Sequence, residues 1–195
     1  MFFTCYIYMT KIFLLFIMDI IAILSVKPLH KSSVDAIVGD ILVGDTDISS
    51  LWEITCGDDP RLAWHAVWVM EVLCKKERSL LLPYRRKIVE KILAGDCEDG
   101  ELRLWLNISL MLLSETKDID VDLLNFSLDN ICNMRLPVAV RAVCIKIAYQ
   151  LCKREPELLK ELQAVLSMLD MKDEPPAIKC GVKKVMADRR LTIDD

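Results

Sequence analysis

Residues 59–74 read DPRLAWHAVWVMEVLC, and this stretch decides the fold because it specifies one helix with a clear beginning. Asp59 suits the N-cap, where its carboxylate accepts hydrogen bonds from the first free N–H groups. Pro60 follows at the first helical position, where a missing N–H costs nothing. The apolar residues that recur every three or four positions form one face: Leu62, Ala63, Ala66, Val67, Met70, Leu73 and Cys74.

Similar helix starts recur along the chain at a regular distance. Asp99-Gly100, Leu136-Pro137 and Glu174-Pro175 follow Asp59-Pro60 at steps of 40, 37 and 38 residues. A constant period in this range is typical of a solenoid made of helical pairs. The expected pairs are residues 48–56 with 60–75, 80–93 with 102–114, 121–134 with 137–153, and 156–171 with 176–189. We therefore predict an all-α fold, a short right-handed α-solenoid of about four to five antiparallel helix pairs.

The composition fits one globular domain. The chain has 195 residues, of which 53% are hydrophobic and 28% are charged, so it can bury a core. Only six residues are Gly, and alternating strand-like runs are few, which favours helices over sheets. The net charge of −4 argues against a general attraction to nucleic acid.

The first 25 residues allow three interpretations. Ile12–Met18 is an apolar run that Asp19 interrupts, and a charge in mid-span disfavours a transmembrane helix. We favour a true start at Met18, which makes residues 1–17 an extension and residues 18–195 the solenoid domain. A membrane anchor and a signal peptide remain the alternatives, and a membrane is a partner only if residues 1–25 are an anchor.

The eight cysteines indicate reduced thiols in a cytoplasmic protein. No two of them have the CxxC spacing of a zinc site, and only two histidines could assist them. We expect most of them to pack as small apolar side chains. A disulfide or metal role is the alternative, and we expect no cofactor.

The repeat resembles the HEAT family of helical repeats over residues 48–189. In that family a turn with Asp and Pro leads into a second helix that carries Arg or Lys and small residues. The matching residues are Asp59, Pro60, Ala63 and Ala66, then Pro137, Arg141 and Ala142, then Pro175, Lys179 and Gly181. The unit at Gly100 departs from the pattern, because Leu104 and Leu106 stand in the matching places. The resemblance implies the fold and says little about function.

The second helices hold the side chains that we expect to contact a protein or peptide partner. Trp64, Trp68, Glu71 and Lys75 follow one another at steps of four, three and four residues, away from the Ala66 face. Two indoles one turn apart make a strong anchor when they are exposed. Arg141 and Lys179 complete the predicted binding set. The alternative is that both tryptophans pack against the flanking helices.

A nucleic-acid-binding or DNA-repair-related protein is the second hypothesis. Its basic residues are Arg85, Arg86, Lys87, Lys91, Lys183 and Lys184. Clusters of this kind on successive repeats could bind phosphates. The alternative is an ordinary solvated surface, because Glu90 and Asp188 interrupt the clusters and no series of aromatic residues for base stacking accompanies them.

The sequence offers no convincing catalytic site. It lacks a nucleophile elbow, a Walker loop, a dinucleotide fingerprint and a zinc-protease motif. Short chains of this kind are sometimes called adenylosuccinate lyases, yet the Ser-rich Met-Pro-x-Lys loop of that enzyme is absent. Asp118, Asp120 and Asp122 begin like a calcium loop but lack its Gly and Glu, so helix capping explains them better. We therefore expect a non-catalytic binding module or scaffold.

Overall fold

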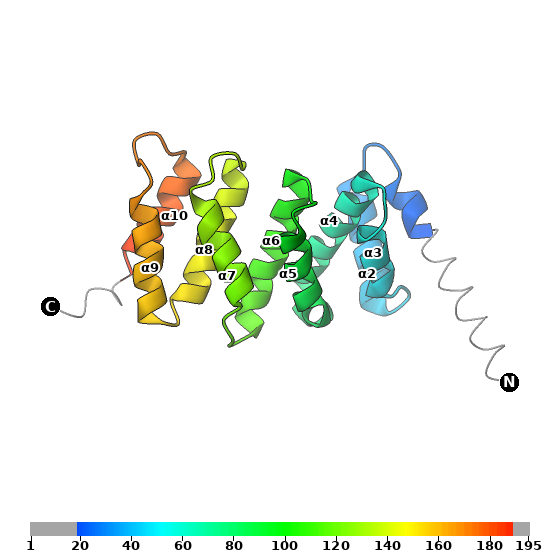
Figure 1. Cartoon of the computed structure of the whole chain (residues 1–195). Helices are drawn as coiled ribbons and strands as arrows, with labels where there is room; N and C mark the ends of the chain where they lie inside the picture. The colour runs from blue at the N-terminus through cyan, green and yellow to red at the C-terminus, as the bar shows by residue number, and fades with distance from the viewer. Residues whose placement is uncertain (1–18, 189–195) are drawn as a thin grey trace. The chain divides into compact units, whose positions relative to one another are not determined.

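The computed structural model describes residues 19–188, and all regular structure within them is helical, with no strand (Figure 1). The chain divides into two compact units, Met1–Pro83 and Tyr84–Asp195. The predicted all-α class is thus confirmed. The expectations for residues 1–17 and for a start at Met18 lie outside the described residues. Every helix in the described part is too short or too polar to span a bilayer.

The first unit is built around α4. A short helical segment at residues 19–24 opens its described part. The helices that follow are α2 (Lys31–Val43), α3 (Ile48–Thr55) and α4 (Pro60–Lys76), and a 3-10 helix (Arg78–Tyr84) comes next. α4 packs against both α2 and α3. The sequence explains two helix ends: Asp47 caps α3 by accepting from the Ser49 N–H at 3.1 Å, and Gly44 ends α2 with φ at 85°.

The second unit consists of three consecutive helical hairpins. They are α5 (Arg85–Ala94) with α6 (Asp99–Leu112), α7 (Val121–Ile131) with α8 (Val138–Cys152), and α9 (Pro156–Ser167) with α10 (Pro176–Met186). The first helices α5, α7 and α9 are neighbours, and the second helices α6, α8 and α10 form a second row (Figure 1). This order confirms the predicted pairs.

Several predicted boundaries need correction. The helix expected over 80–93 is a 3-10 helix up to Tyr84 followed by α5, because Pro83 has no N–H to donate and its ring disfavours an α-helical turn before it. Ser32 and Ser33 are the residues that the sequence offers as caps for α2, but the helix begins at Lys31 after His30, so both serines lie within it. α7, α9 and α10 end three or four residues earlier than expected, since residues after Ile131, Ser167 and Met186 form turns or loops.

The core of the second unit lies between its two rows of helices. Trp105 on α6 is fully buried, and its indole N–H donates to Glu101 Oε1 at 2.9 Å. α8 lies between α6 and α10, and ten of its residues are buried. α10 comes so close that a Cβ on Gly181 would stand 3.2 Å from Ile145 Cγ2.

Candidate functional site

The two predicted anchor tryptophans differ in exposure. α4 begins where the sequence predicts, because Asp59 Oδ1 accepts from the N–H groups of Arg61 at 2.9 Å and Leu62 at 3.2 Å. Trp64 is 38% exposed, whereas Trp68 is half-buried. Trp64 is therefore the more accessible anchor, and Trp68 contributes more to packing.

His65 supports the helix from the inside. Its ring is buried, and its Nδ1 lies 2.8 Å from the carbonyl oxygen of Leu24. The ring centroids of His65 and Trp64 are 5.2 Å apart. His65 is thus a hydrogen-bonded histidine of the interior.

Glu71 does not lie on an open surface, contrary to its predicted position. It is 7% exposed, because α4 has neighbours on two sides and so buries a wide arc of its surface. Its Oε2 lies 2.8 Å from Lys75 Nζ, and the lysine side chain remains 55% exposed. Lys75 is thus reachable, but the acid one turn earlier already balances its charge.

Arg141 is likewise inside the protein and not on a binding surface. Its side chain is 2% exposed, and its Nη2 lies 2.6 Å from Glu174 Oε1. Its Nε donates to the carbonyl oxygen of Ile131 at 2.8 Å. Arg141 is the fourth residue of α8, a position that points toward the neighbouring hairpin, and it therefore ties the α7–α8 hairpin to the turn before α10.

Lys179 occupies the same place in α10, where it is also the fourth residue. It is half-buried, and its Nζ donates to the carbonyl oxygen of Lys172 at 3.1 Å within its own hairpin. The predicted binding set is therefore divided between the two units. Trp64, Trp68, Glu71 and Lys75 belong to the first unit, and Arg141 and Lys179 serve packing in the second.

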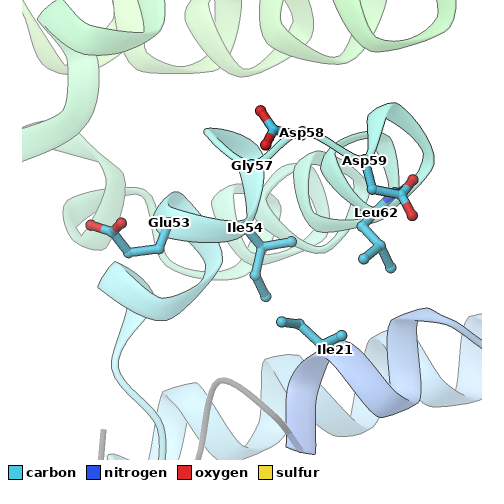
Figure 2. Close-up of a pocket in the computed structure, with 7 residues that line it drawn as sticks. All are labelled: Ile21, Glu53, Ile54, Gly57, Asp58, Asp59 and Leu62. Carbon is cyan, nitrogen blue, oxygen red and sulfur yellow. The ribbon is translucent and has the colours of Figure 1, made fainter. Parts of the chain in front are cut away.

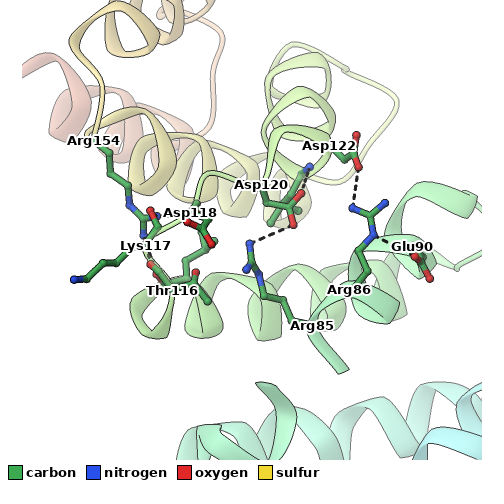
Figure 3. Close-up of polar contacts among 11 residues, drawn as sticks. Arg85, Arg86, Glu90, Thr116, Lys117, Asp118, Asp120, Asp122 and Arg154 are labelled. Carbon is green, nitrogen blue, oxygen red and sulfur yellow. Dashed lines mark hydrogen bonds and ion pairs between the residues drawn. The ribbon is translucent and has the colours of Figure 1, made fainter. Parts of the chain in front are cut away.

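The first basic cluster of the nucleic-acid hypothesis is largely neutralised by carboxylates. Arg85 Nη2 lies 3.4 Å from Asp120 Oδ2, and Arg86 contacts both Asp122 at 3.1 Å and Glu90 at 3.2 Å (Figure 3). The hydrogen bonds to Asp122 and then Glu90 raise the pKa of Arg86.

The two lysines of this cluster also have partners. Lys91 pairs with Asp96 at 3.7 Å, and Lys87 lies over the Tyr84 ring at 5.6 Å. The ion pairs of Arg85 and Arg86 link α5 to α7, that of Lys91 links α5 to the turn after it, and together they offset three of the four positive charges of this cluster.

Arg154 is a structural residue that the sequence analysis missed. Its guanidinium donates to four carbonyl oxygens at 2.7–3.0 Å, those of Leu113, Thr116, Lys117 and Asp118. These carbonyls follow the end of α6, where helical C=O groups lack partners (Figure 3). The only sequence signal was an arginine in the turn after α8, which does not specify a partner so far away.

Lys183 and Lys184, the second basic cluster, are both exposed on α10. The Lys184 ammonium lies 6.0 Å from the centre of the Tyr149 ring on α8. The Tyr149 hydroxyl in turn donates to Asp188 Oδ2 at 2.7 Å.

A shallow hollow of about 230 Å³ in the first unit was also not anticipated. Figure 2 shows its apolar side chains, Ile21, Ile54 and Leu62, and the carboxylates of Glu53, Asp58 and Asp59. Asp59 is committed to the α4 cap: its hydrogen bond from Leu62 is the main cause of its lowered pKa. Nothing in the hollow provides a nucleophile paired with a base.

The aspartates that resembled a calcium loop have structural partners. Asp120 Oδ1 accepts from the Leu123 N–H at 3.1 Å and so caps α7, which confirms the capping interpretation. Asp122 pairs with Arg86. Within residues 19–188, no group of three His, Cys, Asp or Glu side chains is placed to hold a metal ion.

The cysteines vary in burial. Cys144 and Cys152 are buried, Cys97 and Cys132 are half-buried, and Cys56 and Cys180 are exposed, and all six are free thiols. Cys56 is an exception to the apolar packing expected of most cysteines, because it follows the last turn of α3. Burial raises the pKa of Cys144 to about 12 and that of Cys152 to about 11, so both thiols stay protonated.

Comparison with models of known protein families matches residues 23–189 to the HEAT repeat domain. The match covers most of the chain and begins earlier than the resemblance read from the sequence, so it includes α2. Comparisons with curated proteins and with solved structures find no match.

Proposed function

The chain belongs to the family of HEAT repeat proteins, and on this basis we propose that it acts as a protein-binding module that holds a protein or peptide partner against its second helices. Stacked helical pairs present extended surfaces that suit such partners, because each pair adds one more helix to a continuous face. We expect it to act in the cytoplasm, where reducing conditions keep its thiols free.

The observation that supports this proposal most directly is the accessible indole of Trp64. It projects from a helix that is capped at its start and packed on two sides, so it is presented with little loss of conformational freedom on binding. Tryptophan is enriched among residues that dominate binding energy. Trp68, one turn later and half-buried, would form the base of such a contact.

The test is recovery of partners from cell extract with the full chain as bait. We expect Trp64→Ala to lower recovery while far-UV circular dichroism stays unchanged. Leu42→Ala is the matched control, because Leu42 is a similarly exposed apolar residue on α2 of the same unit. Equal recovery with Trp64→Ala would contradict a role for this side chain, and loss of helicity would assign it to the core.

Measuring the binding of duplex DNA at two salt concentrations distinguishes the nucleic-acid hypothesis from the protein-binding proposal. Phosphate contacts strengthen as salt falls, so a nucleic-acid-binding protein must bind at the lower concentration. We expect no binding there, since three of the six basic residues, Arg85, Arg86 and Lys91, are already paired with carboxylates and the net charge of the chain is −4.

A further inference from the structure

The second helices of the second unit present an open face that is rich in cations, and Asp188, which accepts from the Tyr149 hydroxyl, is the carboxylate at its edge. We propose that this face binds an acidic, Asp- and Glu-rich segment of a partner protein. The inference rests on the proposed binding function and adds the chemistry of the partner.

In the hairpins α7–α8 and α9–α10, the charges are segregated between first and second helices, whereas the first helix α5 carries four cations and Glu90. Beyond the first turn of α6, the second helices carry cationic side chains and no carboxylate. The first helices α7 and α9 carry Asp122, Asp129, Glu157 and Glu161, with Lys160 as their one cation. A random distribution of charge for solubility would mix the signs on both rows.

Apart from buried Arg141, which pairs with Glu174, and Lys87, which lies over the Tyr84 ring, the cations of the two rows also differ in their partners. On the first helices, Arg85, Arg86, Lys91 and Lys160 each lie within 4 Å of a carboxylate. On the second helices, Arg103, Lys146, Lys183 and Lys184 form no ion pair with any residue from 19 to 188. Their charge is therefore available to a ligand.

The packing of α8 between its neighbours places its exposed cation on the one side of the helix that remains open. α8 has α7 behind it and α6 and α10 beside it, so only one side remains open. That side carries Ala139, Lys146 and Gln150, at steps of seven and four residues, and Lys153 follows at the C-cap. Lys184 joins this side from α10, because its ammonium lies over the Tyr149 ring.

α6 extends the open side on the other flank of α8. Arg103 and Asn107 are four residues apart and half-buried, in contrast to the buried residues between them. The result is a face with cations on three adjacent helices. Amide side chains among the cations, such as Gln150, can hydrogen-bond to a peptide backbone.

A carboxylate-rich peptide fits this face better than nucleic acid does. The whole chain carries a net charge of −4, which repels a long polyanion, whereas a short acidic segment meets only the local positive field. Apart from Tyr149, which contacts Lys184, the face offers no aromatic side chain for base stacking among the residues named.

The experiment uses fluorescence anisotropy of a fluorescein-labelled oligo-glutamate peptide with the full chain, at about 20 mM and about 150 mM NaCl. An oligo-glutamine peptide of equal length and a duplex DNA are the comparison probes. We expect binding of oligo-glutamate alone, weakened by salt. Lys146→Glu should raise its Kd about tenfold, while Lys160→Glu, the same charge change at an exposed residue of α9, should change it less than about twofold.

Three results would overturn the proposal: no oligo-glutamate binding at the lower salt, an equal loss with Lys160→Glu, or tighter binding of DNA that Lys146→Glu also weakens. Lys183→Glu serves as a second variant if Lys146→Glu loses helicity. If the oligo-glutamate peptide does not bind but Trp64→Ala still lowers partner recovery, only the inference of an acidic partner is wrong. If no partner is recovered and no peptide binds, the proposed function is wrong as well.

Discussion

Consecutive hairpins of the second unit are joined by the same pair of chemical groups at two very different depths. Between the hairpins α7–α8 and α9–α10, Arg141 pairs with Glu174, and the two side chains are 2% and 4% exposed. Between α5–α6 and α7–α8, Arg86 pairs with Asp122, and the side chains are 65% and 50% exposed. Both are arginine–carboxylate contacts across a repeat junction, so the difference between them isolates the effect of burial.

Burial makes the stability of the protein depend strongly on the inner pair, Arg141–Glu174, and only weakly on the outer pair, Arg86–Asp122. A charge removed from water must be compensated fully, and Arg141 achieves this with Glu174 and the Ile131 carbonyl. Glu174 Oε2 has no hydrogen-bond partner within the described residues, so losing Arg141 would leave a poorly solvated carboxylate. The outer pair stays hydrated, and water can replace either partner.

The chain also contains an apolar alternative to the inner pair. The fourth residue of the second helix is Ala63 in α4, Leu102 in α6 and Arg141 in α8. The next second helix brings a corresponding residue two positions before its start. For Leu102 in α6 this residue is Leu136, before α8, and for Arg141 in α8 it is Glu174, before α10. An arginine thus accompanies an acid, and a leucine accompanies a leucine, at corresponding places in successive repeats.

The largest effect is expected from Arg141→Leu. It leaves Glu174 buried without its cation, and we expect a loss of about 3 kcal/mol in the free energy of unfolding. Urea unfolding followed by far-UV circular dichroism measures it. The double variant Arg141→Leu/Glu174→Leu copies the pattern of Leu102 and Leu136 and should recover most of the loss. A double variant as unstable as the single one would mean that the pair itself, and not the orphaned acid, matters.

Labelling of Cys144 should report the same change as a rate. Burial raises its pKa to about 12, so at pH 8 the thiol reacts with iodoacetamide only after the unit opens. A loss of about 3 kcal/mol predicts labelling about 100-fold faster in Arg141→Leu. Peptide mapping by mass spectrometry gives the rate, and exposed Cys180 is the internal control. An unchanged Cys144 rate would show that the junction opens without exposing α8.

Arg154→Ala should have an intermediate effect. It removes a charged donor from four carbonyl oxygens at the end of α6, and we expect a loss of about 2 kcal/mol in the free energy of unfolding. Thermal and urea unfolding measure it. Arg154→Lys is the control: it keeps the charge but lacks the planar fork, so it should restore only part of the stability. If Arg154→Lys kept full stability, the positive charge alone, and not the planar guanidinium, would account for the contribution of Arg154.

Arg86→Ala should change least. Its partners are hydrated, so we expect the melting temperature to fall by less than about 2 °C, and by less still at high salt. Differential scanning fluorimetry is sufficient, with Asp122→Ala as the matched variant. A drop comparable to that of Arg141→Leu would contradict the argument that burial separates the two junctions.

The helical hairpins could be predicted from sequence because they depend on residues close together in the chain. The contacts between hairpins could not, because they join residues far apart in the chain. The Asp59-Pro60 start of α4 could be predicted because a cap depends on residues within one turn. The inward direction of Arg141 could not, because its partner Glu174 lies 33 residues away and the facing hairpin decides which side is buried. Burial of Glu71 was missed for the same reason, since α4 has neighbours on two sides.

The hydrogen bonds from Arg154 to the chain after α6 involve no carboxylate. Backbone oxygens take up no proton at any pH at which proteins fold, and a guanidinium keeps its charge throughout that range. Acidification, which neutralises carboxylates, would therefore leave this attachment in place. The link from the end of α8 back to the loop after α6 should survive in surroundings too acidic for the surface ion pairs beside it.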